Sequence, residues 1–148
     1  MIDYLRRRQL LAEALEIDAD LARARRIAAR LPEPFDAAVN TWVDVLTGTG
    51  KKPSLPIAAA TACRYVRDVE PVLRSWAADG ITSLREITKK HVEDAIEDKD
   101  PRARHVALRS LFRAMRRERL VFRDPARVAV VRPCLRAVQE VVTRECEP

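Results

Sequence analysis

Hydrophobic residues recur at helical spacing through most of this chain, and the pattern is clearest between residues 101 and 127. In that stretch large apolar residues repeat at i, i+3, i+4 and i+7, which places them on one stripe of a helix. The stripe consists of Leu108, Leu111, Phe112 and Met115. We therefore expect a helix whose large side chains face a core.

The same stretch has two further faces. At about 100° per residue, four arginines fall on a second stripe with His105 at its edge. They are Arg102, Arg109, Arg113 and Arg116. Small residues form a third, narrow face: Ala103, Ala107, Ser110 and Ala114. This pattern predicts close approach of a neighbour at the small face and a row of guanidinium groups that could meet an anionic partner.

A long helix is predicted at the N-terminus, from Asp3 to about Arg30, and Pro32 and Pro34 end it. Apolar residues step through it at alternating intervals of four and three: Leu10, Ala14, Ile17, Leu21, Ala24, Ala28 and Leu31. Such a heptad seam fits a long helix packed on its own domain, which we favour, or pairing of residues 10–31 with a second copy or a partner helix.

A shorter helix follows, with Asp36 as its expected cap and Gly48 as its end. Its inward residues are Val39, Trp42, Val43 and Leu46. The segment 47–56 has Gly, Pro and Ser without periodicity, and its Lys51 and Lys52 fit either phosphate contact or solvation. We place a linker at 48–56, between an N-terminal helical extension at 1–47 and a domain at 57–127.

The domain should begin with a helix over 57–78 that ends at Gly80 in a left-handed conformation. Pro71 lies inside it and predicts a kink, or a helix that restarts at Glu70. The core stripe of this helix is Ala62, Tyr65, Val66, Val69, Val72, Leu73 and Trp76.

Ser83 should then begin a short turn, and Thr88 should cap the next helix. That helix points Val92 and Ile96 inward and exposes Lys89, Lys90 and His91 in its first turn. The segment 128–148 is interpreted as a tail, in which 134–143 could form a final helix.

Composition supports an all-α fold. The chain has 148 residues, of which 47% are hydrophobic and 34% charged, and it contains three glycines. No segment alternates apolar and polar residues between turn signals, so hairpins have no support. We expect one compact all-α domain with an N-terminal helical extension.

The charge favours an anionic partner. The net charge is +6 and the pI is near 9.7, mainly because of arginine. The planar guanidinium binds phosphate bidentately, so nucleic acid is favoured over plain solvation.

The sequence lacks the residues that several other functions require. Cys63, Cys134 and Cys146 are widely spaced and odd in number, as expected in a reducing cytosol, and His91 and His105 each stand alone, so we expect no metal and no cofactor. There is no Gly-rich phosphate loop and no nucleophile with a supporting base. There is also no signal peptide or membrane-spanning run, and we expect a cytoplasmic protein.

Four features of residues 60–127 together resemble a known domain. Trp76 and Gly80 form W-x-x-x-G, SLREIT precedes the KKHVED helix, LRSLFRAM follows, and Asp124-Pro125 closes the segment. This arrangement resembles the N-terminal core-binding (SAM-like) domain of tyrosine recombinases and phage integrases. The resemblance implies a SAM-like bundle of four or so helices that clamps duplex DNA for site-specific recombination.

By the same resemblance, the N-terminal parts of the helices at 89–96 and 102–116 would contact DNA. The expected DNA-binding residues are Lys89, Lys90, His91, Arg102, His105, Arg109, Arg113 and Arg116. The chain lacks the arginines, His-x-x-Arg and nucleophilic tyrosine of the family's catalytic domain. We therefore expect DNA binding without catalysis, in a fragment, a truncated integrase or a stand-alone descendant.

The alternative is a helical protein–protein interaction module. In that case the basic face is only solvated, or its arginines pair with acidic residues of the same chain. The candidate acidic residues are Asp68, Glu70, Glu93 and Asp94.

Overall fold

The structure, a computed structural model, describes residues 2–97 and 100–131. Its elements are α1 (Ile2–Ala29), α2 (Phe35–Leu46), α3 (Ala59–Ala78), the 3₁₀ helix η1 (Leu84–Glu86), α4 (Lys89–Ile96), α5 (Pro101–Arg117) and α6 (Pro125–Val128). No strand occurs in these two ranges, so the predicted all-α class is confirmed. The tail beyond Val131, with the helix predicted at 134–143, lies outside the described residues.

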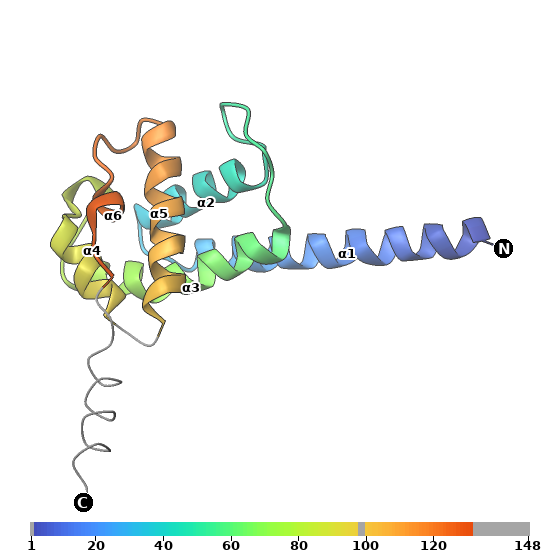
Figure 1. Ribbon diagram of the computed structural model, residues 1–148, viewed down its shortest axis with the longest axis horizontal. Helices are drawn as coiled ribbons and strands as arrows, with labels where there is room; N and C mark the ends of the chain where they lie inside the picture. The colour runs from blue at the N-terminus through green and yellow to red at the C-terminus, as the bar shows by residue number, and fades with distance from the viewer. Residues whose placement is uncertain (1, 98–99, 132–148) are drawn as a thin grey trace, which may run out of the picture.

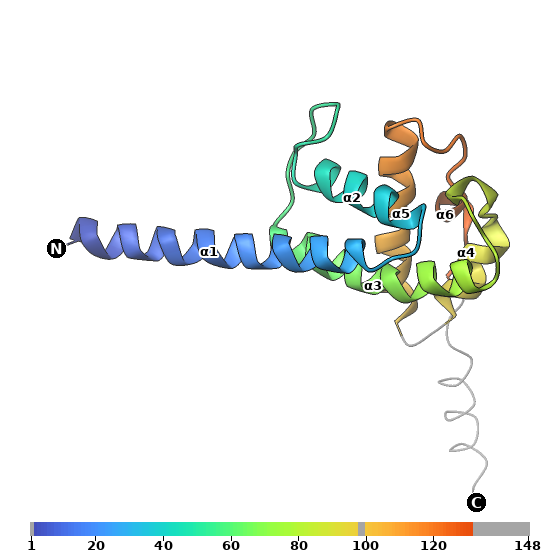
Figure 2. The same cartoon turned by 180° about the vertical axis from the view of Figure 1, so that it is seen from behind.

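The helices pack around α5. α1 and α3 lie side by side, and α5 stands across α3 (Figures 1 and 2). α5 also contacts α2, α4 and α6, so it touches helices that lie before and after α3 in the sequence. One cluster of buried side chains extends from the C-terminal part of α1 to α6, and it includes residues on both sides of the 47–56 segment.

The three faces predicted for α5 each have the expected surroundings. Leu108, Leu111, Phe112 and Met115 are fully buried, and the ring of Phe112 lies 6.5 Å from that of Trp76 on α3. On the small face, Ala107 and Ala114 are buried, so a neighbouring helix can approach closely. Arg102, Arg109, Arg113 and Arg116 are exposed on the third face.

Trp42 of α2 occupies the small face of α5. Its side chain is fully buried, and its indole Nε1 donates a hydrogen bond of 3.1 Å to Oγ of Ser110. Its ring also stacks on Tyr65 of α3, with 6.5 Å between centroids and 7° between planes. A single residue N-terminal to the 47–56 segment thus connects α2 with both α5 and α3.

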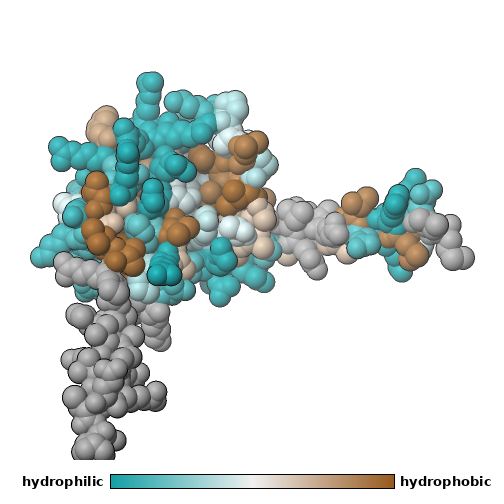
Figure 3. All heavy atoms as spheres, in the orientation of Figure 1, coloured by the Kyte–Doolittle hydropathy of each residue, from teal (hydrophilic) through white to brown (hydrophobic). Residues whose placement is uncertain are grey.

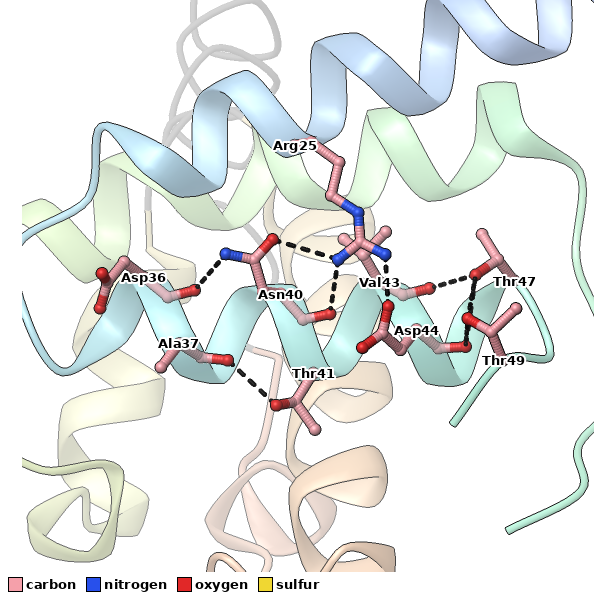
Figure 4. A network of polar contacts seen from close by, with 9 residues as sticks. All are labelled: Arg25, Asp36, Ala37, Asn40, Thr41, Val43, Asp44, Thr47 and Thr49. Atoms are coloured by element: carbon pink, nitrogen blue, oxygen red, sulfur yellow. Dashed lines mark hydrogen bonds and ion pairs between the residues drawn. The ribbon is translucent and has the colours of Figure 1, made fainter. Parts of the chain in front are cut away.

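The C-terminal half of α1 packs on the same core. Ala24, Ala28 and Leu31 of the heptad seam are buried. Arg25 donates from Nη1 to the backbone and side-chain oxygens of Asn40, at 3.0 and 3.1 Å, and pairs with Asp44 (Figure 4). This half of the seam is therefore occupied by the chain's own helices.

The N-terminal half of α1 projects beyond the other helices (Figures 1 and 2). Leu10 is 64% exposed, and Tyr4, Leu5 and Leu11 are similarly exposed. The side chains of 13–18, which include the seam positions Ala14 and Ile17, are outside the described ones. Pairing of this half with a second copy or a partner helix stays a prediction.

One local prediction was wrong, and one of the two alternatives predicted for another helix is excluded. Asp36 does not cap α2, because the helix begins one residue earlier at the fully buried Phe35, and Pro34 is the N-cap residue without a side-chain hydrogen bond. Asp36 lies in the first turn, where its negative charge interacts favourably with the helix dipole. α3 does not restart at Glu70 but continues through Pro71, which is exposed while its neighbour Val72 is buried, and a kink at Pro71 stays a prediction.

Other helix ends match the sequence. Gly80 follows α3 with φ of +86°. The Thr88 hydroxyl accepts from the His91 amide at 3.5 Å, and His91 Nδ1 accepts from the Thr88 amide at 3.0 Å, which forms a capping box on α4.

We predict that removal of the Trp42 side chain destabilises the whole domain. Trp42→Ala should lower the free energy of unfolding by about 3–5 kcal/mol in urea denaturation, because the side chain fills the space between α2, α3 and α5. Ser110→Ala should cost about 1–2 kcal/mol, because it leaves a buried indole N–H unpaired. Ser75→Ala, at an exposed position of α3, should be nearly neutral. A loss below about 1 kcal/mol for Trp42→Ala would contradict a shared core.

Candidate functional site

An open groove of about 1410 Å³ lies between α5 and the loop that joins α2 to α3. Among the described residues that line it, seven are basic and one, Asp124, is acidic. The basic ones are Lys52, Arg109, Arg113, Arg116, Arg117, Arg119 and Arg127. The groove is therefore a strongly positive surface on a protein of moderate net charge.

The arginine stripe of α5 forms one wall of the groove. The large stripe of this helix is fully buried, whereas Arg109, Arg113 and Arg116 of the neighbouring stripe are exposed. These three side chains make no hydrogen bond or ion pair with any residue that the structure describes. Their guanidinium groups are accessible to a ligand and have no acidic partner in this part of the chain.

The α2–α3 loop forms the opposite wall, and it is tied to the helices at several points. Ser54 Oγ donates to the carbonyl of Val45 at 2.8 Å, and the amide of Ile57 donates to the carbonyl of Leu46 at 2.9 Å. Arg117 Nη2 donates to the carbonyl of Pro53. The segment 47–56, which the sequence indicates is a loop or linker, is thus a loop held against α5. Lys52 of this loop therefore lies at the groove.

The floor of the groove is apolar. Val45, Leu46, Ile57 and Ala114 line the groove together with the half-buried Tyr65. On the face shown in Figure 3, hydrophilic side chains cover α5 and a hydrophobic patch lies beside them, toward the loop. The basic wall can hold the anionic groups of a ligand, and the apolar floor can contact the less polar parts between them.

Asp124 does not offset the positive charge through an ion pair. Its Oδ1 accepts a hydrogen bond of 3.1 Å from the amide of Arg127, which caps the short helix α6. The cap lies at the start of α6, whose residue Arg127 lines the groove. The acidic residue thus has a structural role at the edge of the basic surface.

Five of the eight predicted DNA-binding residues lie away from this groove. Arg102 is exposed one turn or more before the groove begins, and Lys90 is exposed on α4. His105 is half-buried, and its Nε2 lies 2.9 Å from the carbonyl oxygen of Ala126, so it connects α5 to α6.

The two other candidates on α4 take part in local structure. His91 belongs to the capping box, and Lys89 forms an ion pair of 3.5 Å with Glu93. Glu93 also accepts a hydrogen bond of 3.1 Å from the amide of Val130. The first turn of α4 is therefore occupied partly by contacts that hold the fold together.

Pairing with acidic residues of the chain explains only some of the basic side chains. Lys89 pairs with Glu93 at 3.5 Å, as the alternative interpretation expects, whereas Glu70 pairs at 3.0 Å with Arg74, which is not one of the candidate residues. Both are i,i+4 pairs of an exposed cation with a half-buried carboxylate near the surface, where such pairs contribute little to stability. The arginines of α5 that line the groove take no part in such pairs among the described residues.

Sequence reasoning missed Arg117, Arg119 and Arg127. Arg117 lies one turn after Arg113, so its helical spacing was a usable signal. Arg119 and Arg127 follow the helix, and the chain path after α5 brings them to the groove.

The described residues give no indication of a metal site or of a membrane span. They contain no group of three or more His, Cys, Asp or Glu side chains placed to hold an ion. None of their helices is both long and apolar enough to cross a bilayer.

Comparison with known proteins found no match: no family model fits the sequence, and no match was found among curated proteins or solved structures.

Proposed function

We propose that this chain is a DNA-binding domain and that the groove between α5 and the α2–α3 loop holds the phosphate backbone of duplex DNA. The observation that carries the proposal is the row formed by Arg109, Arg113 and Arg116, which has no acidic partner among the described residues. Guanidinium groups bind phosphate bidentately, and several aligned cations release counterions from a polyanion when it binds.

The length of the row favours a polymer over a single anion. Arg109 and Arg116 are seven residues apart, which is about 10 Å along a helix. One DNA strand carries a phosphate about every 3.4 Å along the duplex axis, so the row matches several successive phosphates. Lys52 on the opposite wall extends the positive surface across the groove.

The resemblance to the core-binding domain of tyrosine recombinases supports the same proposal. The resemblance implies DNA contacts from the N-terminal parts of both α4 and α5, of which only α5 lines the groove, and it places the catalytic groups in another domain. We accordingly propose a role in clamping DNA during site-specific recombination and assign no reaction to this chain.

We predict that charge reversal in the groove weakens DNA binding without weakening the fold. Arg109→Glu combined with Arg113→Glu should reduce affinity for a short duplex by about tenfold or more at low salt, measured by fluorescence anisotropy. The melting temperature should hardly change, because both side chains are exposed and unpaired among the described residues.

The matched control carries the same change of net charge elsewhere. Arg7→Glu combined with Arg67→Glu alters exposed residues of α1 and α3 outside the groove. It should weaken binding by much less. An equal loss in both variants would mean that net charge alone governs binding and that the groove is not the site.

A second pair of variants compares the contribution of α4 to DNA binding with the contribution of the groove. Arg113→Gln with Arg116→Gln should weaken duplex binding several-fold, whereas Lys89→Gln with Lys90→Gln should change the dissociation constant by no more than about twofold. The reason is that Lys89 and Lys90 lie outside the groove and Lys89 is already paired with Glu93. If the lysine pair mattered as much as the arginine pair, the site would extend to the first turn of α4, as the family resemblance implies.

A further inference from the structure

Among the described helices, α2, α3 and α5 end in the same hydrogen-bonded turn. In each, one amide beyond the helix bonds the carbonyl five residues before it, and the preceding amide bonds the carbonyl three residues before it. The longer bonds are Thr49 to Asp44 at 2.8 Å, Ile81 to Trp76 at 3.0 Å and Leu120 to Met115 at 2.8 Å. The shorter ones are Gly48 to Val45, Gly80 to Ala77 and Arg119 to Arg116.

This turn requires a left-handed residue, and the three helices differ in which residue they place there. α2 and α3 use Gly48 and Gly80, with φ of +81° and +86°, whereas α5 uses Arg119, with φ of +59°. Glycine adopts this conformation without cost, but any residue with a Cβ is crowded by its own backbone. Arginine is therefore the less stable choice at a position where the same fold uses glycine twice.

The fold needs the backbone conformation of Arg119 but not its side chain. The turn redirects the chain so that Val121 enters the core, where it is buried. Glycine would allow the same path. The Arg119 side chain is exposed and makes no hydrogen bond or ion pair with a described residue.

The Arg119 side chain does line the groove. It follows Arg116 and Arg117 at the end of α5 and lies on the same surface as Arg127 of α6. The left-handed residue is therefore the point at which the row of cations on α5 continues beyond the helix toward α6.

We propose that Arg119 is an anion-binding residue of the groove, retained at a left-handed position where glycine would be more stable because its guanidinium binds the phosphate backbone. This inference rests on the proposed function. It adds that the surface that binds phosphate groups continues past the C-terminal end of α5.

The test compares stability and DNA affinity in the same variants. Arg119→Gly should raise the melting temperature by roughly 2–4 °C and weaken duplex binding several-fold. The melting temperature is to be measured in about 0.5 M salt, which screens the favourable interaction of a cation with the end of the helix. Arg119→Lys keeps both the charge and the strained conformation, so it should retain the wild-type melting temperature and most of the affinity.

Arg123→Gly is the control for loss of one positive charge. Arg123 is exposed, lies outside the groove and has no left-handed backbone. This variant should keep its affinity and gain no stability. The opposite changes in stability and binding are thus expected at Arg119 and not at Arg123.

The outcomes separate this proposal from the function on which it rests. If the wild-type chain binds duplex DNA and Arg119→Gly binds equally well, the role of Arg119 is wrong and the groove proposal stands. If Arg119→Gly is less stable than the wild type, the conformational premise is wrong. If the wild-type chain does not bind at low salt, both proposals fail.

Discussion

The fold depends on the contact between the Trp42 indole and the small face of α5. A large ring can approach α5 there because Ala107 and Ala114 leave space, and Ser110 satisfies the buried N–H. This contact, with the stacking of Trp42 on Tyr65, fixes how α5 is rotated about its axis. The rotation turns Phe112 and its apolar neighbours inward, and it leaves the arginine stripe facing the groove.

The same helix thus meets two opposite requirements. Its apolar stripe closes the core, while its basic stripe holds several like charges close together without acidic partners among the described residues. Repulsion between these charges lowers the stability of the free protein slightly, and Arg119 adds conformational strain at the end of the helix. A polyanion in the groove would relieve the repulsion, so features that are unfavourable for folding are consistent with a binding role.

The sequence predicted those parts of the structure that depend on local periodicity. All three faces of α5 follow from helical spacing, and the Thr88 cap and the left-handed Gly80 follow from the preferences of those residue types. The start of α2 could not, because burial of Phe35 outweighs the capping preference of Asp36. Three of the predicted site residues line the groove, but Arg119 and Arg127 reach it through the path of the chain after α5, which no local pattern encodes.

The measurement that tests the central claim most directly is the salt dependence of duplex DNA binding by the wild-type chain. If the groove neutralises roughly four to six phosphates, log K should fall linearly with log salt concentration, with a slope of about −4 to −5. Binding should be tight at low salt and should weaken steeply toward physiological ionic strength. A slope near zero, or no binding at low ionic strength, would contradict the proposal that this groove holds the DNA backbone.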